Sequence, residues 1–288
     1  MRSTLQLALF ACFGLTAPKP VRPDLGLDAQ HKIFSDAALS FQDYRIELRT
    51  SKSKPMRELK IIRFLHKRKL VASFPNEAEF GHNHFGIFPL LSEHGKQLVI
   101  EQYTGGAHCC TQYWIYDLGI EPVLIYRSKD YHVGYEAVFT DLDQNGSYEI
   151  EQRLLTFDYF DRCSHADSPF PHALFKYDSR GRKYLPANSH FASRLLKPLD
   201  ASRRDLGEYK RQSAARGYDE SGVYLGKVLK VLTTHLYAGE IEQGWNFFDG
   251  EYTLPDKIEM RRKIEIQLRK DAAYLAIERE AKTRKSRQ

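Results

Sequence analysis

Oxygen-bearing side chains recur at short intervals in residues 141–149, which read Asp-Leu-Asp-Gln-Asn-Gly-Ser-Tyr-Glu. In proteins calcium takes about six to eight oxygen ligands, and carboxylates, amides and backbone carbonyls supply them. Gly146 permits the sharp bend that brings such oxygens together. The alternative is a hairpin turn that binds nothing, because Asp and Asn are also common turn residues. The spacing predicts a structural calcium site, and its expected ligands are Asp141, Asp143, Asn145, Ser147 and Glu149.

A second group of chemically active residues lies in the sequence Thr-Gly-Gly-Ala-His-Cys-Cys, which occupies residues 104–110. An exported protein meets an oxidising compartment, in which cysteines commonly pair. We therefore expect a disulfide between Cys110 and Cys163, or between Cys109 and Cys163. The alternative is a thiol or metal site, in which a histidine lowers the pKa of a cysteine or joins it as a ligand. The members of that site would be His108, Cys109, Cys110, Cys163 and His165.

Three sequence features together resemble a group of uncharacterised bacterial exported proteins. They are the Gly-Gly-Ala-His-Cys-Cys segment, the Asp-x-Asp-x-Asn-Gly loop that begins at Asp141, and Cys163 ahead of Ser168-Pro-Phe-Pro. The loop is similar to those of FG-GAP and VCBS repeats, which join strands in integrin-type β-propeller blades. It departs from an EF-hand, because Gln152 stands where an EF-hand has glutamate. The resemblance implies an envelope location and carries no known activity.

The N-terminus has the composition of an export signal. Arg2 precedes a short apolar stretch at residues 5–14, and a membrane-spanning helix would need about 20 apolar residues. We therefore expect residues 1–17 to be a signal segment and the proline-rich residues 18–29 to be a linker. The sequence Leu-Phe-Ala-Cys resembles a bacterial lipoprotein box, in which Cys12 would carry the lipid. The expected location is periplasmic or lipid-anchored in the bacterial envelope.

Short strands dominate the expected structure of residues 30–195. Residues 44–49 alternate apolar and polar side chains with period two, which is the pattern of a half-buried strand. Further strand-like runs recur at intervals of about 8–12 residues, and His66-Lys-Arg-Lys is the expected hairpin tip between two of them. This spacing predicts an antiparallel all-β domain, either a propeller-like meander or a sandwich.

The hydrophobic period changes in residues 196–288, where we expect a helical region with a basic tail. Apolar residues at positions 223–236 fall three and four positions apart, as on one face of a helix. A second helix is expected over residues 241–252 and a third over residues 253–275, with Thr253 as its N-cap. The expected fold class is therefore α+β, with an N-terminal β domain followed by helices.

Charge and motif content narrow the function classes. The formal net charge is +6, and much of it lies in the tail at residues 279–288. The body has no basic stripe interleaved with aromatic residues, so we expect no nucleic-acid partner. The chain also contains no Gly-x-Ser-x-Gly, His-Glu-x-x-His, Walker or dinucleotide-binding motif. These absences favour a protein that is not an enzyme.

We therefore expect an exported, non-enzymatic binding or structural protein of the bacterial envelope. Its β domain would be braced by the calcium loop and the disulfide, and calcium is the one cofactor expected. Its partner would be an envelope protein or polymer, with membrane contact only through an N-terminal lipid. One alternative is a thiol- or metal-dependent hydrolase centred on His108, Cys109 and Cys163. Another is an inhibitor or adaptor of a cell-wall enzyme.

Overall fold

The computed structural model describes five segments of the chain, which are residues 38–54, 57–76, 82–105, 111–216 and 221–285. The whole region before the first strand lies outside these residues, including the expected signal segment and Cys12. So do His108, Cys109 and Cys110. What the sequence predicts for those residues therefore stays a prediction.

The described strands form three antiparallel sheets, each with four strands in sequential order. Sheet 1 consists of β1 (Ala38–Phe41), β2 (Tyr44–Lys54), β3 (Arg57–His66) and β4 (Lys69–Asn76). Sheet 2 consists of β5 (His82–Phe88), β6 (Lys96–Tyr103), β7 (Thr111–Leu118) and β8 (Pro122–Arg127). Sheet 3 consists of β9 (Val138–Thr140), β10 (Glu149–Arg153), β11 (His172–Asp178) and β12 (Lys183–Pro186).

Helices follow the last strand. Short 3-10 turns occur at η1 (Ser128–Tyr131) and η2 (Asn188–Phe191). The α-helices are α2 (Ala192–Leu195), α3 (Leu199–Arg216), α4 (Ser221–Tyr237), α5 (Ile241–Glu251), α6 (Lys257–Leu268) and α7 (Ala272–Lys285). None of the described helices combines the length and the apolar character that crossing a membrane requires.

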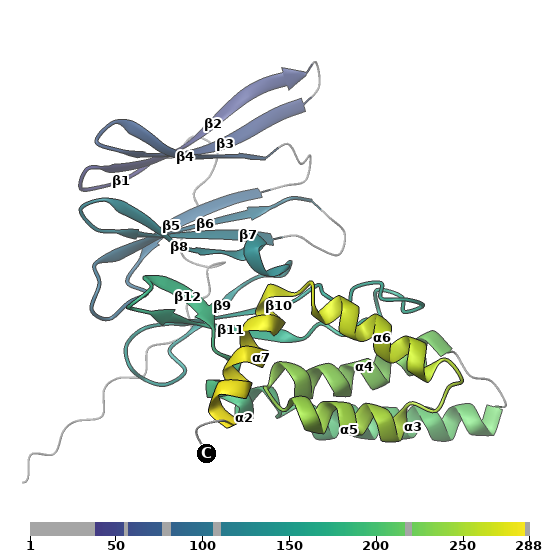
Figure 1. Ribbon diagram of the computed structural model, residues 1–288. Coiled ribbons are helices and arrows are strands. Elements are labelled where there is room, and N and C mark those ends of the chain that lie inside the picture. Colours follow the sequence, from purple (N-terminus) through teal and green to yellow (C-terminus); the bar gives the residue numbers. More distant parts are fainter. Residues whose placement is uncertain (1–37, 55–56, 77–81, 106–110, 217–220, 286–288) are drawn as a thin grey trace, which may run out of the picture.

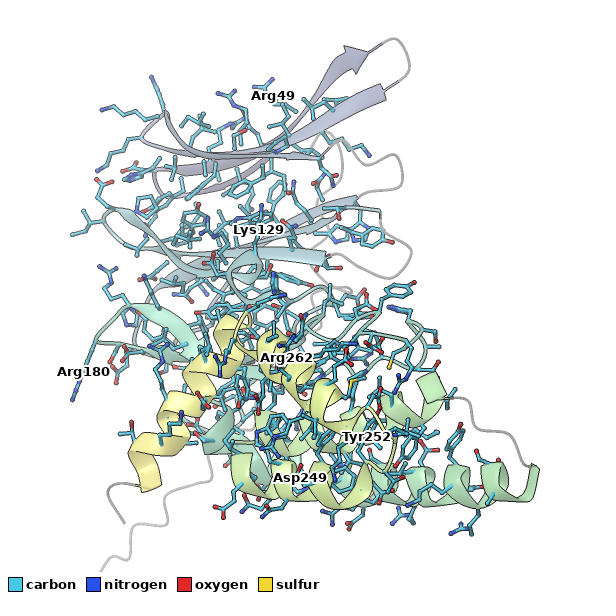
Figure 2. All side chains as sticks on the ribbon, turned by 45° about the vertical axis from the view of Figure 1, so that its right-hand side comes forward. Arg49, Lys129, Arg180, Asp249, Tyr252 and Arg262 are labelled. Atoms are coloured by element: carbon cyan, nitrogen blue, oxygen red, sulfur yellow. The ribbon has the colours of Figure 1, made fainter. Side chains whose placement is uncertain are left out.

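Sheet 2 is the middle layer of the molecule. The three sheets lie one above another, and most of the helices lie beyond sheet 3 (Figure 1). Successive residues of β6 face opposite layers, because Ile100 packs with the core of sheet 1 while Val99 packs with the core of sheet 3 and the helices. Residues 97–102 are therefore all buried. Charged side chains such as Arg49 and Arg180 project from the outer parts (Figure 2).

The helical region shares its core with the β region. On α4, five of the apolar residues that the sequence places on one helix face are fully buried, namely Leu225, Val228, Leu229, Leu232 and Leu236, whereas Val223 near the helix start is half-buried. They belong to the same cluster as Phe139 and Phe175 of sheet 3. Each such side chain contributes about 1.5–3 kcal/mol on burial. The helices thus stabilise sheet 3 directly, by covering its apolar face.

The expected α+β fold class is confirmed, and the β region precedes the helices as predicted. The expected hairpin tip after His66 is also present, where β3 ends and β4 begins. β5 was not predicted, because its sequence His-Asn-His-Phe-Gly-Ile-Phe lacks a clean apolar alternation. α3 was not predicted either, because it is largely exposed and, among its described side chains, Leu206 is the one deeply buried apolar residue.

The third expected helix is divided in two, which corrects the single helix predicted over residues 253–275. It begins at α6, after Asp256 rather than Thr253, and it is interrupted before α7. Asp271 occupies the break and is fully buried. Its Oδ1 accepts the backbone N–H groups of Ala273 at 2.8 Å and Tyr274 at 3.1 Å, as an N-cap residue does.

Asp271 also joins the helices to the β region. Its Oδ2 accepts hydrogen bonds from the hydroxyl groups of Thr156, which follows β10, and Tyr237, which ends α4. A buried carboxylate is tolerated only when hydrogen bonds replace its lost hydration. Both oxygens of Asp271 meet this condition. One side chain therefore fixes the start of α7, the end of α4 and the chain after β10 relative to one another.

Replacing Asp271 with alanine is expected to lower the free energy of unfolding by about 3 kcal/mol or more, because several buried donors lose their acceptor at once. Urea denaturation followed by far-UV circular dichroism measures this change. The control is Asp200→Ala, at an exposed aspartate in the first turn of α3, which should change stability by about 1 kcal/mol or less. An equally small loss for Asp271→Ala would contradict the role given to this carboxylate.

Candidate metal and ligand sites

The predicted calcium loop is the hairpin between β9 and β10, where Thr140 pairs with Glu149. Asp141 shapes the loop, because its Oδ1 accepts the N–H of Asn145 at 3.0 Å and its Oδ2 accepts the N–H of Gly146 at 2.9 Å. Gly146 has a φ of +85°, a conformation that other residues rarely adopt, and an added Cβ would lie 3.0 Å from Cβ of Ser92. The backbone therefore closes around the Asp141 carboxylate.

Three of the five predicted ligands come together in this loop. Oxygens of Asp141, Asp143 and Glu149 all lie within 4.8 Å of one another. Glu149 is buried, and its Oε2 accepts the N–H of Leu142 at 2.8 Å. The pKa of Glu149 is raised to about 7, mainly by burial and with a contribution from the charges of Asp143 and Asp141. A positive charge placed among these three carboxylates would relieve the repulsion between them.

The other two predicted ligands make hydrogen bonds within and beside the loop. Asn145 Oδ1 accepts the N–H of Ser147 at 2.7 Å. Ser147 Oγ accepts the N–H of Ser92 at 3.1 Å, which ties the loop to the chain between β5 and β6. Asn145 and Ser147 therefore help to set the loop conformation.

Lys176 supplies a positive charge that the sequence analysis did not anticipate. It lies on β11, and its Nζ pairs with Asp143 and lies 3.8 Å from Oε1 of Glu149. The ammonium thus lies among the carboxylates where a hard cation would bind. A divalent ion could use these oxygens only by displacing Lys176.

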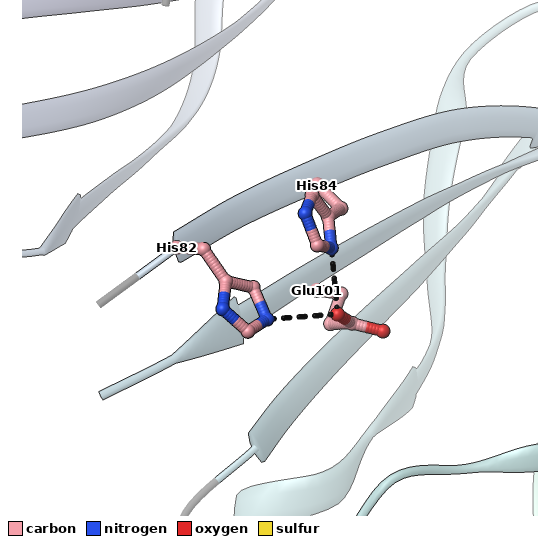
Figure 3. A group of neighbouring side chains, drawn as sticks. All are labelled: His82, His84 and Glu101. Carbon is pink, nitrogen blue, oxygen red and sulfur yellow. Dashed lines mark hydrogen bonds and ion pairs between the residues drawn. The ribbon is translucent and has the colours of Figure 1, made fainter. Parts of the chain in front are cut away.

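A second cluster with metal-ligand chemistry lies on sheet 2 and was missed by the sequence analysis. His82 and His84 are two positions apart on β5, so they face the same side, and Glu101 on β6 pairs with His84. Glu101 Oε1 is 2.8 Å from Nδ1 of His84 and 3.4 Å from Nε2 of His82 (Figure 3). The signal was the His-x-His spacing, which becomes informative only once β5 is identified as a strand.

The Glu101 carboxylate is held by a chain of hydrogen bonds. Its Oε2 accepts the hydroxyl of Tyr113 on β7 at 2.7 Å, and that hydroxyl in turn accepts the N–H of Ala137 at 3.1 Å. Burial opposes ionisation of Glu101, but the hydrogen bonds from His84 and Tyr113 outweigh it, so the pKa of this carboxyl is lowered. Glu101 is thus an ionised, oriented oxygen donor beneath two imidazole rings.

Cys163 is a buried free thiol in the described part of the chain. Its Sγ lies 3.5 Å from the carbonyl oxygen of Gly222 on α4. Burial, with help from Asp167 and Asp161, raises the pKa of Cys163 to about 12. Such a thiol is a poor nucleophile at neutral pH. The predicted disulfide stays a prediction, since Cys109 and Cys110 lie outside the described residues.

His165 is the other described member of the predicted thiol site, and its partners are a carboxylate and a hydroxyl group rather than a thiol. Its Nδ1 lies 2.7 Å from Oδ1 of Asp158, and its Nε2 lies 3.3 Å from the hydroxyl of Tyr135. Neither of the two metal-ligand clusters found among the described residues contains His165 or Cys163. The described geometry therefore gives no support to a hydrolytic centre at these two residues.

A pocket of about 630 Å³ lies where sheet 3 meets the helices, lined by residues of β10, β11, α2, α3 and α4 and by residues 166–171. Gly226 lets the loop approach α4 closely, because an added Cβ would lie 2.2 Å from the carbonyl oxygen of Asp167. The charged lining is mostly basic and comprises Arg153, Arg194, Lys197, Lys227 and Lys230. Glu151, Asp167 and Asp205 are its acidic members.

Glu151 anchors the strand side of this pocket. Its Oε1 lies 2.7 Å from Nδ1 of His172, and its Oε2 accepts a hydrogen bond of 2.8 Å from Nη2 of Arg194. Burial disfavours the charge, but hydrogen bonds from His172 and Arg194 outweigh this effect and lower the pKa of Glu151 to about 2. The ion pair between Arg194 and Glu151 joins α2 to β10.

No protein-family model, curated protein or solved structure matches the chain. Fold and site are therefore interpreted from the residues of this chain alone.

The Glu151 pairing predicts a pH-dependent stability. Because the pKa is lower in the folded chain, this stabilisation is present above the ordinary value of 4.5 and is lost as the pH falls towards about 2. Glu151→Gln should lower the free energy of unfolding at pH 7 by about 1–2 kcal/mol, less than the full shift implies because Arg194 and His172 are partly exposed. Urea titrations from pH 2 to pH 7 measure this, and a difference that stays constant with pH would contradict it.

Proposed function

We propose that this chain is an exported, non-enzymatic binding protein of the bacterial envelope, and that the pocket between sheet 3 and the helices takes a carboxylate-bearing envelope polymer. The observation that carries the proposal is the excess of basic side chains in a pocket large enough for a ligand. The export signal expected from residues 1–17 and the absence of a recognised catalytic motif support the location and the binding role.

The pairing of the charged residues favours an anionic ligand. Two of the acidic lining residues are already paired, since Glu151 binds Arg194 and Asp205 lies 2.7 Å from Lys227. Lys197 and Lys230 are exposed and form no ion pair within the described residues. Two ammonium groups are thus available to a ligand carboxylate at this pocket.

The pocket also offers apolar contacts and hydroxyl groups. Phe170 and Pro198 contribute apolar surface, while Ser202 and Thr234 contribute hydroxyls. Mixed lining of this kind suits a sugar residue, which has both C–H surface and hydroxyl groups in addition to a charge. These features favour an acidic oligosaccharide over a simple inorganic anion.

The test compares tetragalacturonate with maltotetraose, an uncharged sugar of the same length, by isothermal titration calorimetry. The purified protein should bind the charged sugar, and Lys197→Met with Lys230→Met should weaken binding about tenfold by removing two ionic contacts. The matched control is Lys69→Met with Lys129→Met, which removes the same charge elsewhere on the surface. Equal affinity for both sugars, or no effect of the pocket substitutions, would contradict the proposal.

Within this proposal, the Asp141 loop is a calcium-binding brace for sheet 3. Support comes from the three carboxylates of Asp141, Asp143 and Glu149, whose oxygens lie within 4.8 Å of one another. Lys176 provides the competing internal cation. Calcium binding would then exchange an ammonium for a divalent ion without a change in the loop backbone.

Lys176→Met should tighten calcium binding by at least about tenfold, because it removes a cation that contacts the same carboxylates. Calcium at 100 times its dissociation constant should add about 2.7 kcal/mol to the stability of the protein, as thermal unfolding would record. The control is Lys183→Met, at an exposed lysine of the same sheet. A lack of calcium binding in both the parent and Lys176→Met would exclude the brace.

A further inference from the structure

We propose that His82, His84 and Glu101 form a zinc-type site for a divalent transition metal on sheet 2, with two imidazole nitrogens and one carboxylate oxygen as protein ligands. This site is independent of the pocket and of the Asp141 loop. It is built from β5, which is an edge strand of sheet 2, and its neighbour β6, and both imidazole rings are directed at Oε1 of Glu101 (Figure 3).

The donor set selects a borderline metal ion rather than a hard one. Imidazole nitrogen suits zinc, copper, nickel and iron, whereas calcium and magnesium prefer a shell of oxygens. Two histidines with one carboxylate is also a ligand set that zinc uses when a coordination position stays open for water or another ligand. The Asp141 loop, with oxygen donors alone, would select the other class of ion.

The distances fit an ion with small side-chain adjustments. Zinc bonds to nitrogen and oxygen are about 2.0–2.2 Å, so the ligand atoms of a tetrahedral site lie about 3.3–3.6 Å apart. Here the two imidazole-to-carboxylate distances are 2.8 and 3.4 Å, and all three ligand atoms lie within 4.8 Å. The His84–Glu101 contact needs to lengthen by about half an ångström, which a small rotation of the two side chains about their χ angles can provide.

The surroundings hold each ligand in place. Tyr113 donates to the Glu101 oxygen that faces away from the histidines, so the other oxygen remains directed at the imidazoles. The rings of His82 and His84 stack with centroids 4.4 Å apart, and Tyr103 stacks on His82 at 5.1 Å. Such outer partners fix the orientation of metal ligands and raise metal affinity.

The site is both rigid and accessible. Glu101 lies in the fully buried stretch of β6, with 5% of its side chain exposed, whereas His82 at the strand end has 46% of its side chain exposed. An ion can therefore enter from solvent at His82 and meet a preformed carboxylate below.

The test is titration of the full chain, stripped with a chelator, with zinc in a calorimeter and with cobalt(II) in a spectrophotometer. One equivalent of metal should bind, and cobalt should give the intense visible bands of a four-coordinate nitrogen–oxygen site. Glu101→Gln and His84→Ala should weaken binding at least 100-fold, and Tyr113→Phe about tenfold as an outer partner. His190→Ala, at an exposed histidine paired with Glu280, should leave affinity unchanged.

Circular dichroism of each variant separates loss of the site from loss of the fold, and His82→Ala gives a further variant at an exposed position. Unchanged metal affinity in folded His82→Ala and Glu101→Gln would overturn the proposal. Sulfur-to-cobalt charge-transfer bands in the near ultraviolet would also overturn it, because they would assign the ion to cysteine. The absence of stoichiometric binding would leave the three residues as an ion-paired cluster and exclude the metal site.

Discussion

The burial of sheet 2 on both faces is the constraint on which the rest of the structure depends. Its strands contribute Ile100 and Trp114 to the core shared with sheet 1, and Val99 and Ile115 to the core shared with sheet 3. A shift of one residue in the pairing of β6 and β7 would exchange these two sets of side chains and disrupt both cores. The register of sheet 2 therefore determines how sheets 1 and 3 are placed, and sheet 3 in turn supports the helices.

Burial on both faces also decides how polar side chains are used in this sheet. Gln97 is fully buried, and its amide accepts the N–H groups of Leu90 and Leu91 while donating to Asp117 at 3.0 Å. Glu101 follows the same rule, because its two oxygens are occupied by Tyr113 and the histidines. Polar groups in a dry layer must be paired, and the pairing fixes their geometry. The same requirement that stabilises the sheet thus orients the side chains of the proposed metal site.

Local and distant features of the fold differed in how well the sequence predicted them. The clustering of carboxylates in the Asp141 loop was predictable because these residues are close neighbours in the chain, and α4 was predictable because its apolar period is regular. The proximity of Glu101 to His84 could not be predicted, because it depends on the register between β5 and β6. Lys176 was hidden for the same reason, since it reaches the loop from another strand. From the sequence alone, Asp271 would be expected on the surface. In the structure it is buried, and it accepts hydrogen bonds from Thr156 and Tyr237.

Lys176 gives the third sheet a self-sufficient charge balance. Its ammonium belongs to a residue of β11, and it contacts Asp143 and Glu149 when β11 pairs with β10. The chain therefore supplies its own counter-ion, and the hairpin can close without a cation from solution. Under the proposed calcium binding, assembly of the sheet and occupation of its loop are separate events, and only occupation depends on the ions of the surrounding medium.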